Sequence, residues 1–326
     1  MNARATPPAS GGFAGHGRRY MPGLDGLRGL ALAVVVAFHL DVPGFSGGFL
    51  GVSVFFTLSG YLITDLMLSS AGRGDLSLTR FWLARARRLL PAVCTMVLLV
   101  LTWVWATGVE AGQVRDPAVT ALAYVNNWWL IVGQTSYFTE FQHSPLTHLW
   151  SLSIEEQFYF VWPIAVAGAC HGRVRRGMVA LVALIGMVAS TVTMVRVFDP
   201  ADTARAYFGT DARAAELLAG AGLAALWPSA RLHGAVSDTA RRTLDRVGGV
   251  ALSALAIAVV TVSGSTAWLF RGGFAGVALA SATAVAVLAH PASRLARALA
   301  VAPLRWLCSR SYGLYLGHVP LLALAP

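Results

Sequence analysis

The chain has 326 residues, of which 56% are hydrophobic and only 12% are charged. A typical globular domain carries about 25% charged residues, so this chain lacks the ionisable side chains that would coat a water-exposed body. Its mean hydropathy of +0.63 excludes a cytosolic enzyme or a secreted disulfide scaffold and predicts a polytopic membrane protein. Three cysteines lie in or beside apolar stretches without metal-ligand spacing, so we expect free packing residues and no metal site. They are Cys94, Cys170 and Cys308.

The net charge of +10 comes from 25 arginines, with no lysine, against 15 acidic residues. In a soluble protein such a charge would suggest nucleic-acid binding. Here the arginines concentrate in short loops between apolar segments, which is the arrangement that the positive-inside rule predicts for cytoplasmic loops. We therefore expect no nucleic-acid partner. The arginine loops are residues 71–88, 171–176, 229–246 and 291–305.

In chain order, residues 1–23 come first and are rich in Gly, Pro, Ala and Ser without an apolar run. They predict a disordered cytoplasmic tail rather than a cleaved signal peptide. Residues 24–326 follow as one membrane domain, in which apolar segments of about 20 residues predict an all-α transmembrane bundle of nine to ten helices. The segments are 24–42, 47–70, 89–108, 117–133, 154–170, 177–197, 212–228, 247–264, 272–290 and 304–325.

The arginine loops also predict the orientation of these segments. If all ten segments crossed the membrane, loop 171–176 would fall outside. Segment 117–133 carries Asn126 and Asn127 in its middle, and if it only dips into the membrane or lies on the outer face, all four loops fall inside. We therefore predict nine full crossings, with the N-terminus inside and the C-terminus outside.

Two ionisable residues share one face of the first apolar segment. Arg28 and His39 are eleven residues apart, which at about 100° per residue places both side chains on one face, about 16 Å apart along the axis. An ionisable residue at membrane depth is costly unless it faces the bundle interior or a wet cavity. The pair indicates either a functional site or an interhelical histidine with an interfacial arginine anchor.

A second polar group stands where segment 154–170 begins. His148 precedes it, and Glu155 and Glu156 lie in its first turn. Acidic residues there also complement the helix dipole, which is the purely structural interpretation. Because adjacent helical side chains point about 100° apart, one carboxylate can face the core while the other caps the helix or pairs with an arginine.

A third group, Arg85, Arg87 and Arg88, lies directly before segment 89–108. Guanidinium groups suit bidentate phosphate contacts, so the group could hold a nucleotide-bearing donor. It could equally fix the orientation of the helix and bind anionic membrane lipid.

The last apolar segment contains His318, with Tyr315 one turn before it. From composition alone, a packed aromatic helix is the favoured account of these residues over a chemical role. Glycines at the start and middle of the second segment, such as Gly60, indicate close helix packing rather than a phosphate loop.

Five motifs in order make the sequence resemble acyltransferase family 3, the integral membrane acyltransferases that include bacterial O-antigen and macrolide O-acyltransferases. The resemblance covers about residues 20–320. The motifs are Pro22-Gly-Leu-Asp-Gly-Leu-Arg-Gly with the Arg28-x10-His39 spacing, Gly48 to Thr64, Phe81-Trp with Arg85 to Pro91, His148 to Tyr159, and Ser311 to Pro320.

The resemblance implies an acyl-CoA-dependent O-acyltransferase of the bacterial cytoplasmic membrane. Acyl-CoA, expected to be acetyl-CoA, would donate from the cytoplasm with its phosphates held by Arg85, Arg87 and Arg88. The acceptor would be a hydroxyl of a glycan or of a glycosylated small molecule, and membrane lipid would surround the protein.

On the same resemblance the Arg28 and His39 pair is essential. His39 would act as general base on the acceptor hydroxyl, with Glu155 or Glu156 orienting it or fixing its tautomer. Arg28 would support His39 indirectly, contact the donor, or pair with Asp25.

The sequence departs from the family pattern at three places. Ser53 stands where aspartate is common, and Ala84 replaces an arginine often found before Arg85. Members usually continue past the Tyr-x-x-Tyr-Leu-x-His motif into one further helix, whereas this sequence ends at Pro326. We therefore expect its membrane domain to lack that final helix.

A different functional class uses the same residues. In a transporter or proton-coupled carrier, His39, Glu155 and His318 would form a proton relay. Inverted repeats and paired broken helices would favour that class, and the sequence shows neither.

Overall fold

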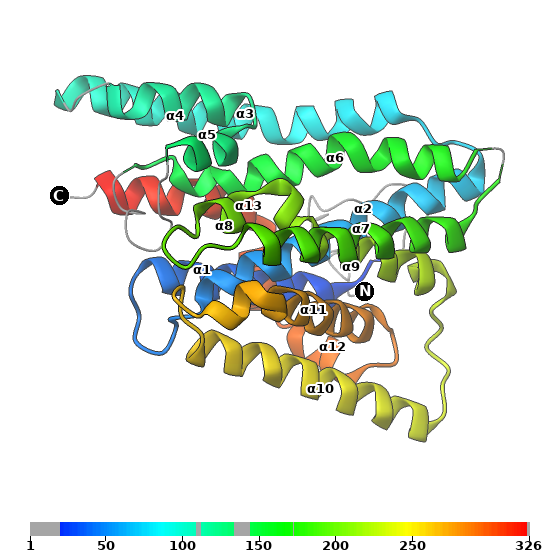
Figure 1. Ribbon diagram of the computed structural model, residues 1–326. Coiled ribbons are helices and arrows are strands. Elements are labelled where there is room, and N and C mark those ends of the chain that lie inside the picture. Colours follow the sequence, from blue (N-terminus) through cyan, green and yellow to red (C-terminus); the bar gives the residue numbers. More distant parts are fainter. Residues whose placement is uncertain (1–19, 109–111, 134–143, 172, 325–326) are drawn as a thin grey trace, which may run out of the picture.

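The computed structural model describes residues 20–108, 112–133, 144–171 and 173–324, which form helices and loops without a strand. The predicted all-α bundle is confirmed, and Figure 1 shows its long helices lying side by side. These are α1 (Pro22–His39), α2 (Gly51–Arg73), α3 (Leu78–Thr107), α6 (Trp150–Ala169), α7 (Arg176–Val197), α9 (Thr210–Leu226), α10 (Asp238–Thr261), α11 (Phe274–Ala289) and α13 (Ala302–Leu324). The shorter elements are η1 (Gly48–Leu50), α4 (Gly112–Leu122), α5 (Asn126–Val132), η3 (Thr147–Leu149), α8 (Ala204–Phe208), η4 (Ser229–Arg231), η5 (Leu269–Gly273) and α12 (Arg294–Leu299).

Six helices of the described chain are long and apolar enough to cross a membrane, and the chain is an integral membrane protein. They are α1, η1 with α2, α3, α7, α10, and η5 with α11. The predicted segments 154–170, 212–228 and 304–325 also fold as helices, namely α6, α9 and α13. Nine crossings therefore stay a prediction. Helix α1 begins at Pro22, inside the predicted tail, and residues 1–19 of that tail lie outside the described residues.

The predicted segment 117–133 does not form one continuous helix. It falls in α4 and α5, of 11 and 7 residues, and Tyr124 between them has a φ of 54°. A crossing needs about 20 helical residues. The buried Asn126 and Asn127 anchor the segment, because their amide groups donate to the carbonyl oxygens of Leu146, at 3.2 Å, and Phe208, at 3.0 Å. The structure therefore agrees with a segment that does not cross the membrane as a single helix.

The loops that hold the clustered arginines share one end of the bundle. Figure 1 shows the connections after α2, α6, α9 and α11 on the right, and the C-terminal end of α13 on the left. Such an arrangement is the one that the positive-inside rule requires if these loops face the cytoplasm together.

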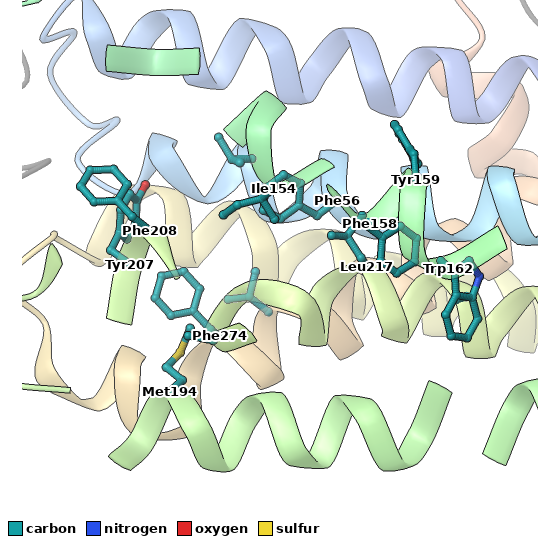
Figure 2. Close-up of a cluster of buried hydrophobic side chains, with 14 of the residues drawn as sticks. Phe56, Ile154, Phe158, Tyr159, Trp162, Met194, Tyr207, Phe208, Leu217 and Phe274 are labelled. Carbon is teal, nitrogen blue, oxygen red and sulfur yellow. The ribbon is translucent and has the colours of Figure 1, made fainter. Parts of the chain in front are cut away.

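Helix α2 forms the centre of the bundle. Of its most apolar 18-residue stretch, 83% is buried, against 17% for α10, which lies at the edge. Helix α9 packs on α2 and α7, and a Cβ atom at Gly60 or Gly220 would collide with the backbone carbonyl of the facing helix. The expected close packing at Gly60 is therefore confirmed. Figure 2 shows the aromatic part of this core, which includes Phe56, Tyr207 and Phe274.

Candidate active site

The glycine-rich start of α1 brings it against α12 and α13. A Cβ atom at Gly26 or Gly29 would collide with the carbonyl oxygen of Leu299 or Leu304, respectively. Gly29 meets Leu304 near the start of α13, and His39 meets His318 near its end, so α1 and α13 are parallel. His39 ends α1, and His318 lies near the end of α13.

Three histidines meet at these helix ends, and we call His39, His148 and His318 the histidine cluster. Nδ1 of His39 and Nε2 of His318 are 3.0 Å apart. The ring centroids of His148 and His318 are separated by 5.5 Å. Nε2 of His148 lies 3.1 Å from the carbonyl oxygen of Leu316. The structure thus brings together two histidines from the ends of the chain and one from its middle.

Tyr315 joins the histidine cluster to the start of α6. Its hydroxyl donates to the backbone carbonyl of His148 at 2.9 Å and lies 2.6 Å from Oγ of Ser151. Because the phenolic proton forms the hydrogen bond to this carbonyl group, the hydroxyl group of Ser151 donates to the Tyr315 oxygen. The two hydrogen bonds hold α13 and α6 in register beside the cluster.

Arg28 borders a cavity that also reaches Tyr315, beside the histidine cluster. A narrow cavity of about 40 Å³ between α1, α2, α6 and α13 has both Arg28 and Tyr315 in its lining. The guanidinium lies 5.7 Å from the centroid of the Phe55 ring. Its Nε is buried without a hydrogen-bond partner among the described residues. A buried donor in that state requires an explanation, and an anionic ligand would supply one.

The two adjacent carboxylates of α6 point in different directions. Glu155 accepts hydrogen bonds from the hydroxyl groups of Ser59, on α2, and Tyr159. Glu156 pairs with Arg85 on α3, with 3.8 Å between Oε1 and Nε. Both carboxylates thus have partners outside the histidine cluster. Within that cluster, His39 contacts His318.

The arginine group before segment 89–108 lies in the first turns of α3. This helix begins after Ser77, whose side chain caps it by accepting from the Arg80 amide. Arg85 is half-buried, with its guanidinium 3.4 Å from the centroid of the Tyr159 ring. Arg87 and Arg88 are exposed, and Arg88 lies close enough to Arg28 and Arg85 to interact with their charges. We call Arg28, Arg85 and Arg88 the basic cluster.

A larger cavity of about 930 Å³ lies between α3, α5, α6 and α9. Its volume is typical of small-molecule sites. The walls are mostly aromatic and aliphatic, and the ion pair between Arg85 and Glu156 forms part of them. The arginine group therefore borders this apolar cavity, while Glu155 and Arg28 border the narrow one.

A buried ion pair that the sequence analysis did not single out lies in α9. Nε of Arg213 donates to Glu216 at 3.1 Å, and its Nη2 donates to Ser53 at 3.3 Å. The guanidinium also lies 4.1 Å from the centroid of the Phe274 ring. Two opposite charges three residues apart in an apolar segment are the signal that could have revealed the pair.

The described residues contain no group of three His, Cys, Asp or Glu side chains placed to hold a metal ion. Cys94, Cys170 and Cys308 are free thiols.

Comparisons with known proteins identify the family. A family model described as an acyltransferase domain matches residues 21–325. The chain is 40% identical over 314 residues to peptidoglycan O-acetyltransferase OatA of Listeria monocytogenes, covering 95% of this chain and 50% of the relative. It is 38% identical over 306 residues to O-acetyltransferase OatA of Staphylococcus aureus, covering 93% of this chain and 51% of the relative. No solved structure matches significantly.

The chain thus spans about half the length of these curated relatives. The family match covers the membrane helices, the histidine cluster and the basic cluster described above. The chain therefore belongs to acyltransferase family 3, the family of integral membrane acyltransferases.

Proposed function

We propose that this chain transfers an acetyl group from acetyl-CoA to a hydroxyl group of a cell-wall glycan. The membrane acyltransferase domain comprises the helices from α1 to α13, and the N-terminus and the arginine loops face the cytoplasm of a bacterial cell. The relatives named as O-acetyltransferases, one of them for peptidoglycan, support the transferred group and the class of acceptor.

The donor binds through its phosphates at the basic cluster and at the neighbouring Arg87. Guanidinium groups form bidentate hydrogen bonds to phosphate oxygens. Arg87 and Arg88 are exposed at the end of the bundle where the arginine loops lie. Arg28 has a buried Nε that lacks a partner among the described residues, and it borders the narrow cavity that leads toward Tyr315.

The transfer itself takes place at His39. Nε2 of His39 accepts the proton of the acceptor hydroxyl while the hydroxyl oxygen attacks the thioester carbonyl carbon. A carbon–oxygen bond forms, the carbon–sulfur bond breaks, and the CoA sulfur leaves as a thiolate. The thiolate then takes the proton from the His39 imidazolium, so that free CoA thiol and neutral His39 are regenerated. The same steps apply whether the attacking hydroxyl belongs to the glycan or to an intermediate carrier.

One observation carries the proposal, namely the positions of the two polar centres along α1. Arg28 lies near the end of the helix beside the arginine loops, and His39 ends the helix at the opposite side of the bundle. Eleven residues separate them by about 16 Å. A donor held at the first centre can present its acyl group to an acceptor at the second. Proton-coupled transport is not favoured, because the family and both relatives are acyltransferases.

Membrane vesicles that contain the full chain test the proposal. The substrates are acetyl-CoA labelled in the acetyl group and peptidoglycan fragments, and the assay measures labelled glycan and released CoA thiol. General-base assistance contributes about 10²- to 10⁴-fold to a rate, so His39→Gln is expected to lower transfer per folded molecule at least about 100-fold.

His290 provides the matched control for this substitution. It is also a buried histidine, but it caps the end of α11 and contacts Trp227 at the arginine-loop end of the bundle. His290→Gln should leave transfer per folded molecule close to parental. Parental transfer by His39→Gln, or vesicles of the parent that consume no acetyl-CoA, would contradict the proposal.

A further inference from the structure

The protonation of the His318 ring follows from its neighbours. Nδ1 of His318 lies 2.7 Å from the carbonyl oxygen of Tyr315 and 3.2 Å from that of Leu314. A carbonyl oxygen can only accept a hydrogen bond. Nδ1 of His318 therefore carries a proton and donates a hydrogen bond to the backbone of its own helix.

His318 is buried, and the described residues place carbonyl groups and aromatic or imidazole rings around it rather than a carboxylate. A buried imidazolium without an anionic partner is costly, so the ring is neutral. In a neutral imidazole with a protonated Nδ1, Nε2 holds the lone pair and accepts. Nε2 of His318 lies 3.0 Å from Nδ1 of His39.

The tautomer of His39 follows in turn. Because Nε2 of His318 accepts, Nδ1 of His39 must donate, and the lone pair of His39 then resides on its Nε2. The two imidazole rings are tilted by 50° with 4.9 Å between their centroids, so the contact is a directed hydrogen bond rather than ring stacking.

We propose that His318 is the positioning residue of the transfer reaction: it fixes His39 in the tautomer whose Nε2 is the base, and it stabilises the imidazolium that forms. This inference rests on the function proposed above. When His39 takes the acceptor proton, its Nδ1–H becomes a charged donor, and a hydrogen bond from a charged donor is roughly twice as strong as a neutral one. Glu155 and Glu156, the partners expected from the sequence, would not have this role.

Three substitutions at residue 318 separate the hydrogen bond from mere packing. Phe keeps a ring but has no acceptor. The carboxamide of Gln reaches the position of Nε2 and can accept from His39, whereas that of Asn ends near the position of Nδ1 and falls short. A packing role would rank Phe first, while the proposed role ranks Gln first.

The assay measures kcat and the KM for acetyl-CoA per folded molecule in vesicles that contain the full chain. Loss of the hydrogen-bonding partner of a metal-ligating histidine typically costs about 10- to 100-fold, and we apply the same factor to His39. We expect His318→Phe to lower kcat by that factor with the KM for acetyl-CoA unchanged, and His318→Gln to recover most of the loss. His290→Gln is the control for substituting a buried histidine.

Nitrogen-15 NMR of labelled histidine gives a readout that does not require turnover. The His39 ring of the parent should show a protonated Nδ1 and an unprotonated Nε2, and His318→Phe should mix the two tautomers.

Two results would overturn the inference. One is a kcat for His318→Phe equal to that of the parent. The other is a His318→Asn variant that is as active as His318→Gln, and this comparison remains decisive if the Phe variant does not insert. Failure of the proposed function looks different, because the parent itself would then transfer no acetyl group. The NMR result would still report the tautomer in that case.

Discussion

The ion pair between Arg213 and Glu216 gives the sharpest prediction about the stability of the bundle. Their side chains are 0% and 1% exposed, so water screens neither charge. Removing one partner of such a pair typically costs about 3–5 kcal/mol, because the other charge stays buried and uncompensated. The substitution Glu216→Leu replaces the carboxylate by an apolar side chain of similar size and leaves the Arg213 guanidinium without its partner.

The remaining contacts of Arg213 reduce the cost. Its guanidinium keeps the hydrogen bond to Ser53 and the face of the Phe274 ring, and a desolvated cation–π contact contributes up to about 2 kcal/mol. We therefore expect Glu216→Leu to lower the free energy of unfolding by roughly 2–4 kcal/mol. The midpoint of thermal unfolding in detergent, measured by size exclusion after heating, should fall by roughly 5 °C or more.

A second substitution tests whether charge is the cause. Replacing both partners of a buried pair by apolar residues is often neutral or stabilising, so Arg213→Met added to Glu216→Leu should restore the midpoint. The exposed pair of Arg205, on α8, and Asp211, at the start of α9, is the control. Its side chains are 31% and 44% exposed, so Asp211→Asn should cost at most about 1 kcal/mol. A parental midpoint for Glu216→Leu, or a double variant less stable than the single one, would refute this reasoning.

Three further predictions concern packing, donor binding and topology. Gly60→Leu should prevent α2 and α9 from packing, which fluorescence-detected size exclusion would show as loss of the monodisperse peak; a normal peak would contradict the close approach of the helices. Arg87→Lys keeps the charge but loses the guanidinium fork, so the KM for acetyl-CoA should rise. An unchanged affinity for acetyl-CoA in the double variant Arg85→Ala, Arg87→Ala would mean that both residues only fix the orientation of the helix. In a cysteine-free background, Leu78→Cys and Val174→Cys should both resist an impermeant thiol reagent in intact cells, and labelling of the second alone would mean that segment 117–133 crosses.

The sequence predicted the helices well because membrane helices carry their signal locally. A run of about 20 apolar residues has few alternatives in lipid, and each predicted segment falls on helices of the structure. The boundaries were less accurate. Helix α3 begins at Leu78, eleven residues before the predicted segment, because Ser77 caps a helix whose first three turns contain the arginines. A search by hydropathy alone leaves out such a charged helix start.

The partners of the site residues could not be predicted in the same way. His39 and His318 are 279 residues apart, and nothing in a linear pattern states that α1 and α13 are neighbours. From the family resemblance, Glu155 or Glu156 was expected to orient His39 or fix its tautomer. The hydrogen bonds and the ion pair of these carboxylates lie with α2, α3 and Tyr159, and a role for them at His39 stays a prediction.

The narrow cavity between the histidine cluster and the basic cluster sets a requirement for the donor binding proposed above. Its volume of about 40 Å³ is far below the roughly 300–1,000 Å³ of small-molecule sites, so an acyl thioester does not fit into it in this structure. Tyr312 and Tyr315, which both line it, donate to the backbone carbonyls of Leu89 and His148. Each of these bonds contributes only about 1 kcal/mol net. In the function proposed above, the donor phosphates form charge-assisted and therefore stronger contacts at the basic cluster, and these contacts would drive the opening that lets the acyl group reach His39.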